Sequence, residues 1–584
     1  MGGTSVPTPL CEIAASGQNS IGTVVLPQSA TTATRLPSAP VTLGHPRCRA
    51  PAMHDHDASR RRFLLQSGSA LGLGALGGAL PALAGPALVS AESARPQLPS
   101  GLQFGDVGDG GATVWARADR AARLWIEIGD EDGFRRALRL RGPLATAAGD
   151  FIARLDVPLS GTAARRVRVA FEDAHSGVRS DWCEGRLRPA PTGALARTRP
   201  VRLVWGGDVA GQGWGINPEI GGMRIFEAMR RRDPDFFLHS GDAIYADGPI
   251  AEQATAEDGR IWRNLVADGV HKVAETLDEY RGRYRYNLRD ENLRRFAAQV
   301  PQIWQWDDHE VVNNWSPAKD LSADPRYTVK DIDVLVRRAR QAFLEYSPQR
   351  RARGRDGDGQ RTRIDRVVRY GPLLDVFVLD MRSYRGGNSA NLQSAADADS
   401  AFLGRRQLRE LAANLRRSRA LWKIVAADMP LGLQVPDGND AQGRPRWEAV
   451  ANGDPGLPRG RELEFAELLH AIRAVDNVVW LTADVHYCAA HYYDPNRAAF
   501  QDFSPFWEFV AGPLNAGSFG PNALDATFGP QVVFQKAPPA PNASPLAGFQ
   551  FFGEVNIDPD SRALSVDLRD IDGRSVFAKT LAAA

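Results

Sequence analysis

The chain has 584 residues, of which 43% are hydrophobic and 24% charged, a composition typical of a soluble globular protein with a substantial core. A chain of this length is expected to contain on the order of three or four domains. Its 71 basic and 69 acidic side chains leave a net charge of +2, so electrostatics give no reason to expect a nucleic acid or an anionic membrane as partner. After position 90 no apolar run is long enough for a transmembrane helix, which excludes a membrane span in the mature chain.

An export signal is predicted near the amino terminus. The basic stretch Ser59-Arg60-Arg61-Arg62-Phe63-Leu64 precedes a weakly hydrophobic run over residues 64–83, and Ala82-Leu83-Ala84 offers a cleavage site. This is the order of regions that a signal peptide requires. The paired arginines followed by Phe-Leu resemble the signal of the twin-arginine route. A short membrane anchor is the alternative, but a run so rich in glycine makes a poor spanning helix.

We therefore predict that residues 53–97 are a twin-arginine signal peptide and linker. The twin-arginine export machinery is then a partner, and the mature protein is periplasmic or secreted. Residues 1–52 lie upstream of the signal and are rich in Thr, Ser, Pro and Ala without periodicity. Since a signal normally begins close to the initiator, we expect Met53 to be the true start; otherwise residues 1–52 are a disordered extension.

The four cysteines predict neither a disulfide framework nor a zinc ribbon. They are too few for this length and lack CxxC spacing. Cys11 and Cys48 precede the expected cleavage site, and the sequence does not decide whether Cys183 and Cys488 pair.

Residues 98–195 are predicted to form a small β-sandwich of the immunoglobulin or fibronectin kind. Runs at 113–117, 123–128 and 166–170 alternate apolar with polar or small residues and are separated by Gly and Asp turns. A period of two is typical of half-buried antiparallel strands, and about 90 residues of them suit a sandwich. The Arg-Pro-Ala-Pro-Thr-Gly run at 188–193 predicts the linker that follows.

Residues 196–584 are predicted to form an α/β domain of layered sheets with flanking helices, because strand and helix patterns alternate there. Strands are expected at 201–205, 235–239, 301–306, 373–379, 421–427 and 477–481, and helices at 223–231, 333–345, 404–417 and 460–474. Insertions over the sheet are expected at 250–300 and 384–400, and a solvated loop at 350–363.

Polar residues suited to chemistry follow five of these strands. The segments are Gly206-Gly207-Asp208, Ser240-Gly241-Asp242-Ala243-Ile244-Tyr245-Ala246-Asp247, Asp307-Asp308-His309-Glu310 with Asn313-Asn314 beyond it, Asp380-Met381-Arg382-Ser383-Tyr384, and Thr482-Ala483-Asp484-Val485-His486-Tyr487. Because ligand sites of open α/β sheets lie outside the carboxyl ends of the strands, we expect these segments to converge.

An oxygen-rich cluster of Asp, His and Tyr suits iron, manganese, calcium or magnesium better than copper or structural zinc. Several carboxylates at one rim repel one another unless multivalent cations lie between them, which predicts two or more metals. Taken singly, each segment also fits a structural role, such as a Gly-Asp turn, a hydrogen-bonded Asp–His pair or a core tyrosine. Five such segments at the same end of their strands favour a site.

The combination of motifs resembles the alkaline phosphatase D family of the calcineurin-like metallophosphoesterases. The motifs are Gly-Asp, Ser-Gly-Asp-x-Ile-Tyr-Ala-Asp, Trp-Asp-Asp-His-Glu, Leu-Asp-x-Arg-Ser-Tyr-Arg and Ala-Asp-Val-His-Tyr, in that order. Gly101-Leu102-Gln103-Phe104-Gly105-Asp106 and Thr113-Val114-Trp115-Ala116-Arg117 are similar to that family's amino-terminal β domain. The resemblance covers roughly residues 98–580, and the motifs are specific in combination rather than singly.

The resemblance implies a role for each matching residue. Asp242 would bridge two metals, and Tyr245 would give a phenolate to a ferric ion. His309 would lie near the leaving group, and Arg382 would hold a phosphate oxygen. The remaining metal ligands that it implies are Asp308, Asn313 or Asn314, Asp484 and His486. Asp208 is expected as a replacement ligand where the chain departs from the family.

One departure bears on the metals. Members of the family carry a Cys in Ala-Ser-Cys-Gln after the first strand, whereas this chain has Gly207-Asp208-Val209-Ala210-Gly211-Gln212. Asp208 replaces a thiolate with a carboxylate, which weakens the Fe(III) and Ca(II) pair that the resemblance implies and leaves manganese, magnesium or zinc open.

The expected activity is that of an exported alkaline phosphatase or phosphodiesterase in which a metal-bound hydroxide attacks phosphorus. A small-molecule or lipid phosphoester is the expected substrate, and monoester and diester preferences stay open, including a phospholipase D-like phosphodiesterase. Another alternative is a non-catalytic exported binding protein that contains metal. A Ser or Asp hydrolase is disfavoured because no Gly-x-Ser-x-Gly elbow occurs.

Overall fold

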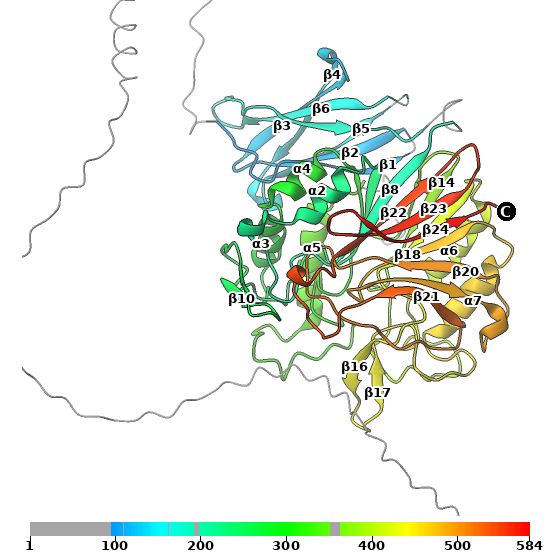
Figure 1. Cartoon of the computed structure of the whole chain (residues 1–584). Coiled ribbons are helices and arrows are strands. Elements are labelled where there is room, and N and C mark those ends of the chain that lie inside the picture. Colours follow the sequence, from blue (N-terminus) through cyan, green and yellow to red (C-terminus); the bar gives the residue numbers. More distant parts are fainter. Residues whose placement is uncertain (1–94, 109, 160, 162, 192–197, 351–361) are drawn as a thin grey trace, which may run out of the picture. The chain divides into compact units, whose positions relative to one another are not determined.

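The computed structural model describes residues 95–108, 110–159, 161, 163–191, 198–350 and 362–584. Two large sheets with flanking helices contain the strands that precede the predicted site residues (Figure 1). Within this part, one sheet has nine strands in the order β24-β23-β22-β8-β9-β12-β1-β2-β5. Its strands are β24 (Ser575–Leu581), β23 (Leu564–Asp570), β22 (Phe551–Ile557), β8 (Val201–Gly206), β9 (Phe236–Ser240), β12 (Gln302–Gln305), β1 (Leu102–Gly108), β2 (Gly111–Arg117) and β5 (Ile152–Pro158).

The second sheet has seven strands among the described residues, in the order β13-β14-β15-β18-β20-β19-β21. Its strands are β13 (Arg366–Arg369), β14 (Leu374–Val378), β15 (Trp422–Ala426), β18 (Val478–Thr482), β20 (Phe506–Val510), β19 (Cys488–Tyr493) and β21 (Pro530–Lys536). At the centre of each sheet the strands are parallel: β8, β9 and β12 in the nine-stranded sheet, and β14, β15, β18 and β20 in the seven-stranded sheet.

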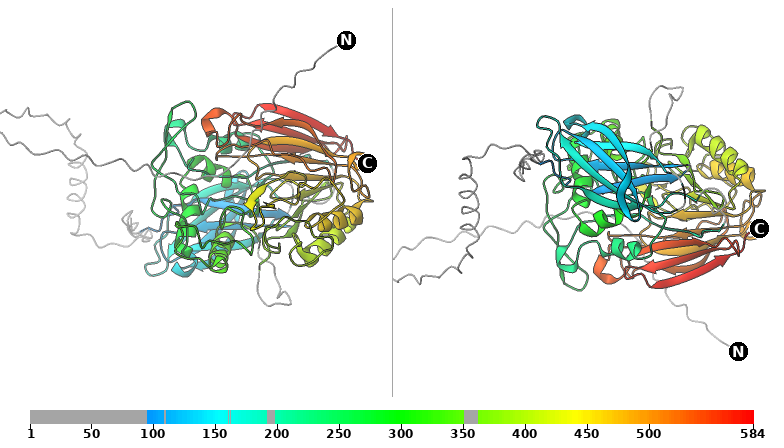
Figure 2. Two further views of the ribbon diagram at one scale, coloured as in Figure 1. Left: turned by 90° about the horizontal axis from the view of Figure 1, so that it is seen from below. Right: turned by 90° about the horizontal axis from the view of Figure 1, so that it is seen from above.

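The two sheets pack face to face and are covered by helices on their outer sides. Because successive strand residues point to opposite faces, Leu203 of β8 joins Ile424 of β15 in the core between the sheets. On the other face, Val204 packs against α2 (Arg224–Arg230) and α4 (Glu291–Ala297). Similarly, Val425 packs against α6 (Gly404–Arg417) and α7 (Glu462–Ile472), which lie side by side (Figure 2). The result is a layered helix–sheet–sheet–helix arrangement.

The remaining elements lie beside these layers. A four-stranded sheet, in the order β4-β3-β6-β7, contains β4 (Gly133–Ala145), β3 (Ala122–Asp130), β6 (Arg165–Asp173) and β7 (Cys183–Leu187). Helices α3 (Leu277–Asn287) and α5 (Ile332–Tyr346) share a core with Trp304 and Trp306. Two hairpins are formed by β10 (Gln253–Thr255) with β11 (Ile261–Arg263), and by β16 (Pro436–Asn439) with β17 (Pro445–Trp447). Short 3-10 helices are η2 (Ala147–Gly149), η4 (Pro218–Ile220), η5 (Pro495–Arg497) and η6 (Pro545–Ala547).

The strands expected in residues 98–195 are present, but they join the rest of the molecule. β1, β2 and β5 continue the nine-stranded sheet because β1 pairs with β12 through Gly105 and Gln302, and the facing four-stranded sheet shares the same core. All described residues belong to one compact unit, Leu88–Ala584. These strands thus share a sheet and a core with residues 196–584, and a separate β-sandwich domain over 98–195 stays a prediction.

Other predictions concern the termini, loops and cysteines. The predicted signal at 53–97 and the doubtful extension at 1–52 lie outside the described residues, apart from the last few of the linker, as does most of the expected loop at 350–363. The expected insertion at 250–300 carries β10, β11, α3 and α4. Cys183 and Cys488 are both free thiols. In the described part of the chain, none of the helices is long and apolar enough to cross a membrane.

Asp150 ties the β1–β2–β5 region to the helices. Its carboxylate accepts hydrogen bonds from Arg117 Nη2 at 2.9 Å and Arg285 Nη1 at 2.8 Å, and from the Tyr346 hydroxyl. Burial opposes ionisation, but the bonds from Arg117 and Tyr346 and the positive charges of Arg117 and Arg285 lower the pKa of Asp150 below its ordinary value of 3.8. The ionised form is therefore the one that stabilises the fold.

We predict that Asp150→Asn lowers the free energy of unfolding by about 2 to 3 kcal/mol at pH 7, because the arginines lose their counter-charge. Asn also tolerates the left-handed backbone of this position, whose φ is 50°. Because the folded-state pKa is depressed, the contribution is fully present above pH 3.8 and is lost as the pH falls through the folded pKa. Denaturant unfolding at pH 7 and near pH 3 measures the free energies of unfolding of the wild type and the variant. The difference between the two proteins should be smaller at the lower pH. Asp181→Asn, at an exposed ion pair with Arg95, is the control and should have no measurable effect.

Candidate metal centre

Six aspartates, here called the acid cluster, follow the carboxyl ends of parallel strands in the two sheets. Asp208 follows β8, Asp242 follows β9, and Asp307 and Asp308 follow β12; Asp428 follows β15 and Asp484 follows β18. The strands come from facing sheets, so their ends meet at one rim. Hydrogen bonds between the two sheets hold these strand ends close together. Gln305 Nε2 donates to the Ala426 carbonyl at 2.8 Å, and Trp205 Nε1 donates to the Thr482 carbonyl at 3.2 Å.

Donor atoms gather into three groups that share residues. Within each group all donor atoms lie within 4.8 Å of one another; the groups are Asp208, Asp242 and His486; Asp242, Asp308 and His309; and Asp307, Asp308 and Asp484. Asp242 belongs to two groups and so does Asp308. A shared carboxylate between neighbouring groups is the arrangement expected of a polynuclear metal centre.

Many carboxylate oxygens of the acid cluster lack a hydrogen-bond donor among the described residues. They are both oxygens of Asp208, Asp242 Oδ2, Asp307 Oδ2, Asp308 Oδ1 and Asp428 Oδ1. Burial raises the pKa of Asp208 to about 8, and burial together with neighbouring carboxylates raises that of Asp242 well above its ordinary range. Buried, unpaired carboxylate oxygens cost free energy unless a cation binds them, so these residues fit hard multivalent cations.

The turns that present the ligands are strained. Asp208 and Asp484 have φ of 68°, His486 has φ of 59° and Asp242 has φ of 49°, in the left-handed region that costs free energy for residues other than glycine. Glu310 joins the turn at Asp242 to the segment that follows β12. Its carboxylate accepts hydrogen bonds from the amides of Ala243 and Asp307, each at 2.7 Å. The backbone is thus bent so that the carboxylates point to a common centre.

The Tyr245 hydroxyl lies beside His486, a member of the first group of donors. His486 Nδ1 contacts the Gly517 carbonyl, so this nitrogen carries the proton and Nε2 keeps its lone pair. Nε2 lies 2.8 Å from the Tyr245 hydroxyl and 3.8 Å from Asp208 Oδ1. Burial lowers the pKa of His486 to about 4, which keeps the imidazole in the neutral form that a metal ligand requires.

His309 is held by Asp247, the last residue of the predicted segment 240–247, to which the sequence analysis gave no role. His309 Nδ1 lies 2.7 Å from Asp247 Oδ1, and the other oxygen of Asp247 accepts a bond from the Asn313 amide at 2.9 Å. Burial opposes ionisation of Asp247, but the positive charge of His309 and the bond between the two lower the pKa of Asp247 to about 2. The His309 ring also lies against the Tyr245 ring, with centroids 4.3 Å apart.

The structure gives the two asparagines of the predicted site, Asn313 and Asn314, different roles. The Asn314 amide donates to Asp308, and its side-chain Nδ2 donates to Asp437 Oδ1 at 3.0 Å. Asn313 is exposed and contributes its backbone to Asp247 and Lys319. Asn314 therefore holds the Asp308 carboxylate in place, and the prediction that the side chain of Asn313 or Asn314 binds metal stays a prediction.

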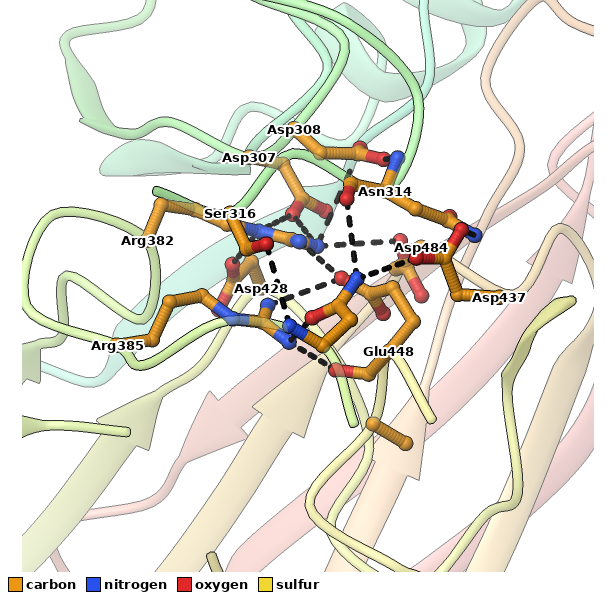
Figure 3. A network of polar contacts seen from close by, with 12 residues as sticks. Asp307, Asp308, Asn314, Ser316, Arg382, Arg385, Asp428, Asp437, Glu448 and Asp484 are labelled. Carbon is orange, nitrogen blue, oxygen red and sulfur yellow. Dashed lines mark hydrogen bonds and ion pairs between the residues drawn. The ribbon is translucent and has the colours of Figure 1, made fainter. Parts of the chain in front are cut away.

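Arg382 is fully buried, and its guanidinium lies among the acids of the cluster (Figure 3). Its Nε is 2.6 Å from Asp307 Oδ1 and 3.2 Å from Asp428 Oδ2, and its Nη1 contacts Glu448. Nη2 faces Asp308 at 4.0 Å and Asp484 at 3.8 Å. Burial opposes the charge of Arg382, but these carboxylates raise its pKa well above the ordinary value, so it is a permanent cation inside the cluster. Whether it also holds a phosphate oxygen stays a prediction.

Sequence reasoning missed two acids that the structure brings to this place, Asp428 and Glu448, and it placed Asp307 in a candidate segment without giving it a role. Asp428 directly follows a predicted strand, so the rule that located the other ligands would have found it. Glu448 follows the β16–β17 hairpin and contacts Arg382 only through the fold, and no local pattern marks it.

Fold and site together define a layered α/β protein whose strand ends bring together Asp and His groups that could hold metal ions. The model of the PhoD-like phosphatase family matches residues 203–568, and the chain belongs to this family. A second match, to a family of unknown function (DUF6053), covers residues 1–32.

Two relatives are similar to this chain. Alkaline phosphatase D of Bacillus subtilis (strain 168) is 27% identical over 327 residues, which are 52% of this chain and 50% of that protein. The chain thus spans about half the length of the curated relative it matches. A solved structure described as "Structure of PhoD" aligns over 84% of this chain and 90% of its own, with a TM-score of 0.61 and 19% identity, so the likeness is one of fold.

Gly512 offers a test of Asp208 as a ligand. A Cβ at this position would lie 2.2 Å from Asp208 Oδ2, which is a steric clash, so one of the two groups must move. Asp208 is fully buried. We predict that Gly512→Ala turns the Asp208 carboxylate away and lowers the bound metal, measured by elemental analysis, by at least about half. Gly149→Ala is the matched control, because its Cβ would meet nothing within 4 Å. Unchanged metal content in Gly512→Ala would contradict the assignment of Asp208.

Proposed function

We propose that this protein is an exported, metal-dependent phosphoester hydrolase of the alkaline phosphatase and phosphodiesterase type. The observation that carries the proposal is the set of buried, unpaired carboxylate oxygens, whose donor groups share Asp242 and Asp308. Membership of the PhoD-like phosphatase family supports a phosphoester as the substrate, either a small molecule or a lipid.

The first ion would be held by Asp208, Asp242, Tyr245 and His486, and further ions by Asp242, Asp308, Asp307 and Asp484. Carboxylate, phenolate and imidazole donors favour hard ions, so Fe(III) with Ca(II) and the alternatives manganese and magnesium fit better than zinc. When bound, the ions would supply the Lewis acidity that activates water and neutralises charge on the phosphoryl oxygens.

The chain's own residues would orient the substrate and move a proton. Asp247 holds Nδ1 of His309, which leaves Nε2 to donate a proton to the departing oxygen. Arg382 balances part of the negative charge of the acid cluster from within it. Its Nη2, which contacts Asp307 and faces Asp308 and Asp484, is the group that would approach a phosphate oxygen. No covalent intermediate on the protein is required.

Export through the twin-arginine route and a periplasmic or secreted location complete the proposal. It rests on the Ser59–Leu64 motif and on the apolar run that follows it.

Hydrolysis before and after metal removal tests the activity. The purified protein should hydrolyse p-nitrophenyl phosphate or bis-p-nitrophenyl phosphate, and the faster of the two identifies a monoesterase or a diesterase. Chelation should remove at least about 99% of turnover, because the donors lose the ions that activate water, and added metal should restore it. Asp242→Asn, which changes the carboxylate shared by two donor groups, should lose turnover similarly. Metal content without hydrolysis of either ester would favour a binding protein, and full turnover after exhaustive chelation would refute the proposal.

A leaving-group series tests His309. We predict that His309→Gln lowers kcat by about 100-fold for an alkyl phosphate, whose alkoxide needs a proton, and by less than about tenfold for p-nitrophenyl phosphate, whose phenolate does not. Asp247→Asn should show the same substrate preference with a smaller loss, because it disturbs only the orientation of the ring. An equal loss for both esters in His309→Gln would assign the residue to metal binding or folding instead.

A further inference from the structure

The side chain of Arg461 joins two loops that lie next to Arg382. One loop, residues 385–388, continues the turn that carries Arg382, and the other, residues 447–449, begins at the end of β17. Arg461 is the residue before α7 and is only 1% exposed. Its Nη1 donates to the carbonyls of Trp447 at 2.9 Å, Glu448 at 2.8 Å and Ala449 at 3.2 Å, and its Nη2 donates to the carbonyls of Gly386 at 3.1 Å and Gly387 at 3.2 Å and to Asn388 Oδ1 at 2.8 Å.

The positive charge of Arg461 is not used in an ion pair among the residues that the structure describes. The carboxylate of Glu448 attracts it at longer range but pairs with Arg382 and Arg385. Burial, together with repulsion from Arg385, lowers the pKa of Arg461 well below its ordinary value, so a guanidinium group at this place costs free energy. The contribution of Arg461 therefore comes from its planar fork of donors, which reaches both loops at once.

Glu448 connects these loops to the acid cluster. Its carboxylate contacts Arg382 Nη1 and lies 3.0 Å from Arg385 Nη1 (Figure 3). The backbone of Glu448 is held as well, because its amide donates to the Val435 carbonyl at 2.8 Å and its carbonyl accepts from Arg461 and Arg385. Glu448 belongs to no helix or strand, so these contacts fix its position.

Glu448 in turn fixes one edge of the Arg382 guanidinium group. Nη1 of Arg382 contacts Glu448, and its Nε lies 2.6 Å from Asp307 Oδ1. Nη2, which contacts Asp307 and faces Asp308 and Asp484, is the atom proposed to approach a phosphate oxygen. Because the group is planar, contacts at Nε and Nη1 together determine where Nη2 points.

We propose that Arg461 is a positioning residue for phosphoester hydrolysis, which fixes Glu448 and, through Glu448, the direction in which Arg382 Nη2 meets the phosphoryl group. The hydrogen-bond partners of Arg461 include no member of the acid cluster, so its effect on the reaction passes through Glu448. The inference rests on the proposed function, in particular on the contact between Arg382 and a phosphate oxygen. Loss of Arg461 should therefore weaken the binding of phosphoryl groups and leave the metal content unchanged.

Steady-state kinetics of the full-length, metal-containing protein with Arg461→Lys test the proposal. Lysine keeps the charge but lacks the planar fork, so it cannot hold both loops. KM for the nitrophenyl ester that the wild type hydrolyses faster, and the inhibition constant of inorganic phosphate, should each rise at least about tenfold, while kcat changes less than about threefold. Elemental analysis should find the wild-type metal content. A role in folding alone would not separate KM from kcat in this way.

Arg459→Gln is the matched control for Arg461→Lys. This exposed arginine lies two residues earlier in the chain and pairs with Asp454 at 3.2 Å. Because exposed ion pairs contribute little, the control should keep the wild-type KM and the wild-type inhibition constant.

A double-mutant cycle with Glu448→Gln tests the route of the effect. Glutamine lacks the charge that pairs with Arg382, so Glu448→Gln should raise the same two constants. Arg461→Lys in the Glu448→Gln background should raise them by less than about twofold further, because residues that act through one contact are not additive. Effects of the two substitutions that multiply independently would overturn the proposal.

Asn391→Ala takes the place of Arg461→Lys if the latter does not fold. Asn391 Oδ1 accepts from the Arg461 amide at 2.7 Å, so its removal displaces Arg461 without removing the guanidinium group. The same separation of KM from kcat is expected, with a smaller rise. Wild-type constants in a folded Arg461→Lys, or failing that in Asn391→Ala, would overturn the positioning role alone. A wild type that hydrolyses neither ester would instead refute the proposed function, and the inference with it.

Discussion

Repulsion among buried carboxylates is the constraint on which the rest of this molecule depends. Six aspartates are brought together at one rim, and several of their oxygens have no donor among the described residues. Burial and mutual repulsion raise the pKa values of Asp242, Asp307 and Asp484 well above the ordinary range of a carboxyl group. Such an arrangement is stable in its ionised form only when cations bind it, so folding, metal binding and the proposed chemistry are coupled.

The fold provides what holds the acids in place. Two sheets with parallel centres direct their carboxyl ends to the same rim, and Gln305 and Trp205 donate hydrogen bonds across the gap between them. Left-handed turns at Asp208, Asp242 and Asp484 aim the side chains inward at a cost that the surrounding packing must offset. Arg382 supplies a permanent positive charge from within the protein, which reduces the repulsion that the ions must balance.

Local pattern was enough to predict much of this arrangement. The strand before Asp208 and the strand before Asp242 are marked by short apolar runs, and the strand-end rule then places both acids at one rim. The same rule applies to Asp428, which was overlooked. Glu448 could not be found in this way, because it contacts Arg382 only across 66 residues of chain. Nor could the joining of β1 to β12, because this pairing links residues far apart in the sequence and no local periodicity records it.

Unpaired carboxylate oxygens gather at the carboxyl ends of the parallel strands in both sheets. These oxygens carry the central claim, and metal stoichiometry tests it most directly. Elemental analysis of the protein purified without chelators and without added metal should give at least two multivalent ions per chain. Protein that is folded and contains no such ions would contradict the account, because the acid cluster would then be stable without the cations that its buried oxygens require.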